Sequence, residues 1–591
     1  MTFNRYYQEE LLALRELGRE FSKRNPGLSA FLDTPGRDPD VERILEGFAF
    51  LSGRLRQKLD DELPEITHSL FSLLWPNYLR PIPACSIIQY QPGDNISGAA
   101  TLPRGTMVES VPVEGTRCRF RTVYDVDIYP LRITALNILE RSGEAAIELR
   151  FQTLNVPLEN LVLTRLPFFL AGETAIAHTL YITLVHRVRE IRIILRDSQM
   201  EERIVTTLSA ENIVPMGFAE KEGLYPYPAN TFPGYRILQE FFCFPEKFLF
   251  VELSGLGQGL EKRILQSFPG LTEFSIHFVL KELPGLYDAF RPDNFQLFCT
   301  PVVNLFPMDS SPLVLDQHQT EYRIVPDPRQ PSHYAVYSVD HVGTWGMNDR
   351  DSRTYLPFES FEYETGKERD AAWFRLRMRP SHKDDGTETY ISFVQRLDGA
   401  VIPKKETISM ELTCTNRLLP KELRVGDICI HADNTPAAVS FSNITPVIPS
   451  FNPPLEGDIL WRLLSNMSLN YVSLTDINAL RAVISTYDFR APHDRPKARM
   501  LEKILNSMVG IECSETDRIY RGLPVRGAQT RLTIDQRAFS CEGAMYLFGS
   551  ILDEFFALYA TVNSFHQLII KEFSRGETYT WPARLGRTQI A

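Results

Sequence analysis

Most of the chain is divided into short segments whose composition suits β-strands better than helices. From Pro81 to Pro449, runs rich in Val, Ile, Tyr, Phe and Thr are separated by Gly, Pro, Asn and Asp. Branched and aromatic side chains fit a pleated, half-buried strand, whereas proline and glycine end regular structure. With 40 prolines and 37 phenylalanines, the sequence favours many short strands joined by firm turns over long helical bundles.

The runs predict a series of strands with two helices between them. The strands are expected at residues 86–91, 117–124, 126–133, 148–154, 177–184, 191–195, 248–253, 275–280, 374–378, 390–395 and 408–413. The helices are expected at residues 157–166 and 232–242. Because 591 residues exceed what one hydrophobic core usually holds, we expect two β-rich modules, at 81–310 and 311–450.

The first segment, residues 1–80, has a helical pattern instead. Tyr7, Leu11, Leu14, Gly18 and Phe21 recur at 4-3-4-3 spacing, which marks one seam of a helix. A second helix is expected from Pro39, with Asp38 as its N-cap, and a third from Pro64 to the residue before Trp75-Pro76.

These helices carry narrow apolar seams, so they bury little against one another. They therefore form a bundle with another chain or pack on the rest of this one, and the heptad-like spacing favours a bundle. The expected bundle contacts are Tyr7, Leu11, Leu14, Phe21, Leu45, Phe48 and Leu55.

A proline-rich stretch, residues 445–454, has the composition of a linker. After it the pattern predicts helices at 460–471, 476–487, 496–508 and 544–558, and strands at 532–534 and 565–572. Residues 455–591 are thus expected to form a C-terminal α+β domain. The predicted fold class is α+β and multidomain, with an N-terminal helical segment and β-rich middle modules.

Charge, cysteine usage and hydropathy narrow the function classes. The net charge is −11 and basic residues are interleaved with acidic ones, which does not fit binding to nucleic-acid phosphates. Eight cysteines occur singly, without a CxxC pair, as in reduced cytoplasmic proteins. No apolar run reaches the ~20 residues of a membrane span, and no signal peptide is evident. We expect a cytoplasmic protein without direct membrane insertion.

Motifs that carry catalysis or bind cofactors are not found in the sequence. It has no Walker A run, no GxSxG elbow and no HExxH motif. The histidines are dispersed, and none lies at zinc-ligand spacing with a cysteine or glutamate. The sequence predicts no catalytic residues, no cofactor and no metal, and hence a protein that is not an enzyme.

Several stretches, in order along nearly the whole chain, resemble one family. They are Tyr6–Leu11, Asp38–Leu51, Gly234–Phe248, Cys299–Phe306, Tyr337–Asp340 and Cys414–Arg417. The sequence resembles the TssF (ImpG) family, a subunit of the bacterial type VI secretion baseplate. The most specific stretch contributes the candidate family-motif residues Tyr235, Arg236, Glu240, Phe244 and Pro245, although an aromatic-rich junction of this kind often packs in the core.

The resemblance implies a phage baseplate wedge-like fold and a structural role in a contractile, phage-tail-like injection machine. Expected partners are TssG, a second TssF copy, TssK, TssE, the VgrG spike and the Hcp tube. Assembly around the spike would initiate the contractile sheath and tube. The expected location is the cytoplasm, beneath the inner-membrane complex of a Gram-negative bacterium.

Two alternatives remain open. A baseplate-associated enzyme that cleaves the cell wall would need two carboxylates about 5–10 Å apart in a cleft. A stand-alone scaffold would purify alone, without an obligate partner.

Overall fold

The computed structural model divides the chain into two compact units. One unit contains Met1–Leu79 and Pro454–Ser468, and the other contains Arg80–Pro453 and Leu469–Ala591. The residues that the structure describes are 2–25, 39–60, 64–93, 98–141, 143–196, 202–227, 233–260, 262–265, 268–316, 318–344, 353–358, 372–381, 386–394, 406–432, 439–453, 455, 476–490, 494–520, 522–557, 560 and 564–586.

The described part of the first unit is helical, as the sequence predicts. Its elements are α1 (Thr2–Arg24), α3 (Pro39–Asp60), α4 (Pro64–Leu74) and the 3-10 turn η2 (Pro76–Tyr78). α4 ends before Trp75-Pro76, because a residue that precedes proline is disfavoured in the α region. The ring of Tyr78 lies edge-on to those of Phe71 and Trp75, at centroid distances of 5.5 and 4.2 Å. The predicted N-cap Asp38 lies outside the described residues.

A six-stranded antiparallel sheet lies at the base of the second unit. In order, its strands are β24 (Ile428–His431), β3 (Met107–Val113), β4 (Thr116–Thr122), β15 (Cys299–Val303), β1 (Cys85–Pro92) and β25 (Val439–Asn443). β1 pairs with β15 on one side and β25 on the other, so this sheet unites the beginning and the end of the β-rich region.

A five-stranded antiparallel sheet and two smaller ones join the six-stranded sheet, and together these sheets form what we call the body. The five strands are β10 (Glu202–Ser209), β9 (Val188–Arg196), β13 (Glu273–Leu280), β7 (Glu144–Thr153) and β6 (Leu131–Arg141). The smaller sheets are β11 (Ile213–Pro215), β12 (Phe250–Ser254), β8 (Arg165–Leu170) and β14 (Phe295–Leu297), and the pair β2 (Ala100–Leu102) with β5 (Val126–Ile128).

Two four-stranded sheets enclose a further core that includes Phe306, Tyr355, Ile391 and Met410. One contains β16 (Phe306–Asp309), β23 (Glu406–Thr415), β17 (Leu313–Leu315) and β19 (Ala335–Thr344). The other contains β18 (Tyr322–Arg323), β22 (Thr387–Val394), β21 (Ala372–Pro380) and β20 (Tyr355–Pro357). The domain boundaries near 80, 310 and 450 stay predictions.

The C-terminal part is α+β. Its elements are α10 (Ile477–Thr486), α11 (Arg495–Ser507), β26 (Met508–Tyr520), β27 (Leu523–Ile534), α12 (Glu542–Ala557), β28 (Phe565–Glu572), β29 (Thr578–Thr580) and β30 (Arg584–Leu585). α12 connects the parallel strands β27 and β28. The helix predicted at 460–471 lies outside the described residues.

The proline-rich stretch after β25 is bound to the body. Ile82 and Phe451 exchange two backbone hydrogen bonds of 2.8 and 2.9 Å, and Cys85 and Ile448 exchange two more. The Oγ of Ser450 also donates to the carbonyl of Ile82 at 2.8 Å. Residues 444–453 therefore form a fixed strap that continues the pairing of β25 along the start of β1, rather than a free tether.

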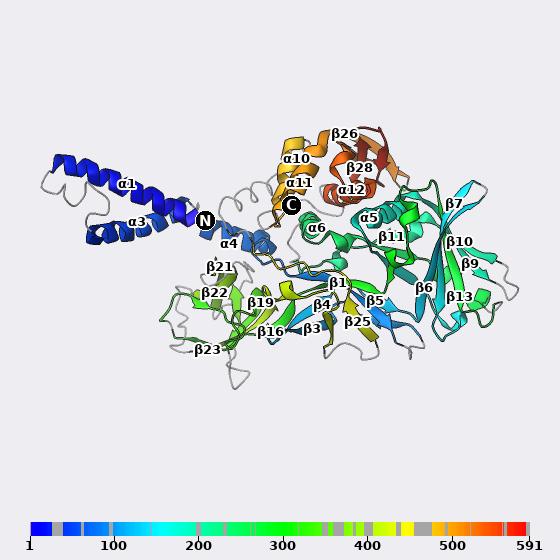
Figure 1. The fold of residues 1–591 in the computed structure, drawn as a ribbon, viewed down its shortest axis with the longest axis horizontal. Coiled ribbons are helices and arrows are strands. Elements are labelled where there is room, and N and C mark those ends of the chain that lie inside the picture. The colour runs from blue at the N-terminus through cyan, green and yellow to red at the C-terminus, as the bar shows by residue number, and fades with distance from the viewer. Residues whose placement is uncertain are drawn as a thin grey trace. The chain divides into compact units, whose positions relative to one another are not determined.

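α12 packs against α5 (Thr174–Ile182) and α6 (Pro233–Cys243) of the body (Figure 1). At the start of α12, Glu542 accepts two hydrogen bonds, of 2.7 and 2.8 Å, from Arg187. The next residue is Gly543, where a Cβ would overlap the carbonyl group of His178 in α5. Only glycine lets the two backbones approach this closely.

Two predicted elements are wrong and several strands are missed, among them β3, β10, β15 and β19. Residues 177–184 are not a strand, because they form the end of α5 and a π-helical turn, Thr183–Arg187. The buried residues Ala177, Leu180, Tyr181 and Leu184 have helical spacing. Residues 157–166 form only a short 3-10 turn, Leu158–Asn160, before β8. Strand β26 is not anticipated at all, since its alternating polar residues offer little apolar signal.

Gly543→Ala tests the close approach of α12 to α5. The added methyl group has no room, and overpacking of this kind costs about 1–3 kcal/mol. We expect a lower urea midpoint, followed by intrinsic fluorescence. Gly510→Ala is the control, because a Cβ at Gly510 meets nothing within 4 Å. Equal midpoints for the two variants would contradict this packing.

Candidate assembly interface

α1 and α3 form an antiparallel hairpin (Figure 1). Arg15 pairs with Glu42 at 2.8 Å, and Arg56 pairs with Glu10 at 2.9 Å. A Cβ at Gly53 would lie 3.1 Å from the backbone nitrogen of Tyr7, so the two backbones lie in close contact there. Ion pairs at the surface or partly buried, such as these, contribute little energy, and here they mainly fix the register of the two helices.

Four predicted bundle residues, Tyr7, Leu11, Leu14 and Leu45, are half-buried. Tyr7 lies against Gly53 of α3, and Leu11 and Leu14 follow it along the same seam of α1. Ala49 of α3 is fully buried.

The other three predicted residues, Phe21, Phe48 and Leu55, are exposed. Phe48 and Leu55 belong to a longer row on α3, which we call the outer stripe: Ile44, Phe48, Leu51 and Leu55. Between 58% and 72% of each of these side chains is exposed. Leu12 and Leu17 of α1 and Phe50 of α3 are exposed too. A helical hairpin this apolar on its outside presents a surface that soluble monomers rarely leave uncovered.

Sequence reasoning missed Ile44 and Leu51, although the signal was present. Residues 44, 48, 51 and 55 have 4-3-4 spacing, the repeat of a two-heptad seam. The prediction instead followed Leu45, which belongs to the half-buried set.

The family-motif residues occupy the interior of the second unit. Tyr235, Arg236, Glu240 and Phe244 are each at most 4% exposed, and Pro245 opens the 3-10 turn η7 (Pro245–Phe248) directly after α6. The Arg236 guanidinium donates to the carbonyls of Phe218 and Ala219 at 2.7 and 3.1 Å. Four of the five residues pack in the core, and Pro245 is half-buried.

At the centre of this region Glu240 and Lys247 form an ion pair in which both side chains are fully buried. Lys247 Nζ also donates to the carbonyl of Gly217 at 2.9 Å, and Glu240 Oε1 accepts from the backbone N–H of Leu224 at 2.8 Å. Burial lowers the pKa of Lys247 to about 8, against the opposing influence of Glu240. The pair ties α6 and η7 to the loop before them.

Tyr235 connects the same helix to the C-terminal part. Its ring stacks on that of Tyr487, at a centroid distance of 5.0 Å and an interplanar angle of 13°. α6 therefore contacts the body on one side and the C-terminal helices on the other.

Among the described residues, no group of three or more His, Cys, Asp or Glu side chains is placed to hold a metal ion. None of the described helices is long and apolar enough to cross a membrane.

Comparison with known proteins identifies the family. A family model described as "Type VI secretion system, TssF" matches residues 1–588. The chain belongs to the TssF family. The resemblance noted in the sequence is therefore confirmed, and the chain is a member of a family of type VI baseplate subunits.

This TssF family member is similar to one curated relative in sequence and to two chains of known structure in fold. "Type VI secretion system component TssF1" of Pseudomonas aeruginosa is 28% identical over 626 aligned residues, which cover 98% of each chain. A chain in the cryo-electron microscopy structure of the TssK-TssF-TssG baseplate subcomplex is 30% identical, with a TM-score of 0.76 over 93% of this chain and 100% of that one. A chain of the type VI baseplate complex is 27% identical, with a TM-score of 0.68 over 100% of both. These matches confirm the α+β, baseplate-like fold class.

Substitution of Lys247 tests whether its buried ion pair with Glu240 stabilises this TssF family member. Lys247→Met leaves the Glu240 carboxylate buried without its counter-charge, and we expect a loss of about 3–5 kcal/mol in stability to urea. The double variant Glu240→Gln/Lys247→Met removes the stranded charge and should lose less than Lys247→Met alone. Lys221→Met, at an exposed lysine, is the control. A Lys247→Met midpoint equal to that of the control would overturn this role for the pair.

Proposed function

We propose that the chain is a non-catalytic wedge subunit of a type VI secretion baseplate, and that the outer stripe of α3 binds its partner subunits. The observation that carries this proposal is the exposure of four large apolar side chains at heptad spacing on one 22-residue helix. The related chain of known structure is part of a complex with TssK and TssG. The partners proposed here are TssG and a second TssF copy in the bundle, with TssK linked to them.

Simple energetics support the stripe as an interface. Burying a Leu, Ile or Phe side chain contributes about 1.5–3 kcal/mol, so four of them supply a substantial part of the free energy of a bundle. Most of that gain is absent while the hairpin stands alone. A partner helix with a matching apolar seam would cover the stripe by knobs-into-holes packing.

The remaining partners fit the same mechanical role. TssE, the VgrG spike and the Hcp tube are proposed neighbours of the assembled wedge, in the cytoplasm beneath the inner-membrane complex. Obligate interfaces of this kind bury ~2,000 Å² or more. They would hold the wedge until a trigger reorients its subunits and contraction begins.

Co-expression with the TssG-family and TssK-family subunits of the same system tests the proposal. We expect the wild type to elute as a heteromer in size-exclusion chromatography with light scattering. Ile44→Asp/Leu51→Asp should abolish the heteromer, because two carboxylates cannot be buried in an apolar seam. The helical signal in circular dichroism should not change, since both side chains are already exposed.

Arg43→Gln/Arg54→Gln is the matched control, because it alters net charge by the same two units on exposed positions of α3. This variant should still assemble. Assembly of the aspartate variant at wild-type yield would refute docking through the outer stripe.

The cell-wall-cleaving alternative has a separate check. The purified chain should leave a peptidoglycan suspension turbid under conditions in which lysozyme clears it. Clearing by the wild type would favour an enzyme.

A further inference from the structure

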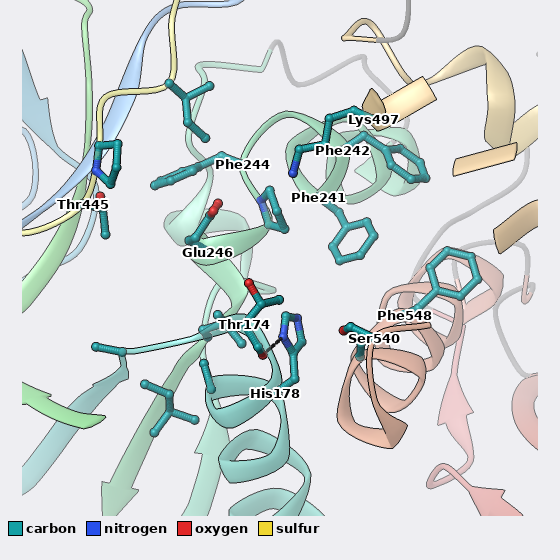
Figure 2. A pocket seen from close by; sticks show the side chains of 18 of the residues that line it. Thr174, His178, Phe241, Phe242, Phe244, Glu246, Thr445, Lys497, Ser540 and Phe548 are labelled. Carbon is teal, nitrogen blue, oxygen red and sulfur yellow. Dashed lines mark hydrogen bonds between the residues drawn. The ribbon is translucent and has the colours of Figure 1, made fainter. Parts of the chain in front are cut away.

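A groove of about 670 Å³ lies in the second unit, between the body and the C-terminal helices. One wall is formed by α5 and by the corner between α6 and η7, and the other by α11 and the start of α12 (Figure 2). The strap closes one side with Ile444, Thr445, Pro446 and Ile448. None of the bundle residues discussed above lines this groove.

The floor of the groove is aromatic. Phe241 lies 5.4 Å from Phe242 and 6.1 Å from Phe548, measured between ring centroids, and Phe548 lies 5.8 Å from Phe539. Figure 2 shows Phe241, Phe242 and Phe548 around the same space, with His178 of α5 across from them. Burial lowers the pKa of His178, which favours the neutral form of this imidazole. The floor suits apolar side chains.

The α11 wall adds positive charge. Met500 of α11 lines the groove and is 45% exposed, and Lys497 lines it one turn earlier. On a helix of 3.6 residues per turn, Lys497 and Lys503 lie about 60° to either side of Met500. Both lysines are exposed. An apolar side chain at the lip of the groove is thus flanked by two cations.

The lysines are not placed where they would best stabilise α11. Lys497 lies in the first turn, where a cation opposes the helix dipole, and Arg495 and Arg499 bring further positive charge to the same end. The N-cap Asp494 offsets only part of this charge, by accepting from the backbone N–H of Lys497 at 3.2 Å. The basic residues at the start of α11 therefore do not stabilise its dipole.

Across the groove from the lysines of α11, the opposite wall carries the carboxylate of Glu246 in η7. One of its carboxylate oxygens, Oε2, is buried and has no hydrogen-bond partner among the described residues. Glu246 lines this side of the groove, so its carboxylate disfavours a carboxylate of the occupant there. Lys497 and Glu246 therefore lie on opposite walls, and Asp488 and Arg490 also line the groove.

We propose that this groove docks an acidic amphipathic helix of a partner protein. Its apolar side chains would rest on the phenylalanine floor, as in other helix-in-groove complexes, and its carboxylates would face Lys497 and Lys503. A helix fits better than a small carboxylic acid, because Lys503 lies on the flank of α11 outside the groove lining. The inference adds a second docking surface to the proposed wedge role, and the test below does not require the outer stripe.

Fluorescence anisotropy with a designed peptide tests this groove. The peptide is about 18 residues long, or about five turns, with Leu and Phe on one face and Glu on the other. We expect saturable binding to the full wild-type chain. Lys497→Glu/Lys503→Glu should weaken it at least about tenfold through charge repulsion. Ala544→Trp, which fills the groove, should abolish it.

The matched control is Arg495→Glu/Arg499→Glu, which makes the same change of charge on the same helix at positions that do not line the groove. It should bind as the wild type does. Met500→Ser, at an exposed residue, provides a second groove variant if Ala544→Trp fails to fold, and it too should weaken binding.

Three results would overturn the proposal. They are the absence of binding, equal weakening by both charge variants, and displacement of the peptide by dodecanoate at matched concentration, which would make the groove a small-molecule site. Failure of the wedge proposal gives a different result: the wild type forms no heteromer on co-expression, while peptide binding to the groove is unchanged.

Discussion

The buried ion pair between Glu240 and Lys247 holds the region on which the rest of the second unit depends. Both side chains are fully buried, and each makes one further hydrogen bond to the loop before α6. Lys247 also offers its backbone carbonyl to the hydroxyl of Tyr124, at 3.0 Å, which links the pair to the β-sheet body. A buried pair of this kind stabilises a fold only when every partner is in place, so it fixes one arrangement of α6 and η7.

That arrangement sets the position of the C-terminal part. α6 presents Tyr235 to Tyr487 and Phe241 to Phe548 of α12, while Gly543 brings α12 directly onto α5. The strap adds backbone hydrogen bonds along β1. The result is a second unit whose sheets and C-terminal helices share a large buried core. The outer side of the α1–α3 hairpin, by contrast, keeps large apolar side chains exposed.

The sequence predicts the parts of the fold in which local pattern and burial agree. α4 ends where Trp75-Pro76 requires it, and α10 follows its N-cap Asp476. Prediction fails where an element is apolar on all sides, as in α5, because a buried helix and a buried strand then look alike. It also fails for β26, whose pairing with β27 depends on a hairpin rather than on an apolar face.

The sequence predicts that the candidate interface is a helical bundle, but it identifies only some of the exposed apolar residues. The heptad spacing of α1 and α3 indicates a bundle, yet it cannot say which seam the hairpin uses for itself. Three of the seven predicted residues, Phe21, Phe48 and Leu55, are exposed, and the paired helices show that Ile44 and Leu51 are exposed with them. The pairing of Glu240 with Lys247 joins α6 to η7 through tertiary packing, which the local sequence pattern does not contain.

Hydrogen–deuterium exchange along α3 tests the central claim most directly. The chain would be compared alone and in the heteromer formed with its co-expressed TssG-family and TssK-family subunits. If the outer stripe docks those partners, the amides from Ile44 to Leu55 exchange markedly more slowly in the heteromer, because local opening of a buried helix is suppressed. Equal exchange of these amides in both samples would contradict the claim that the wedge assembles through this surface.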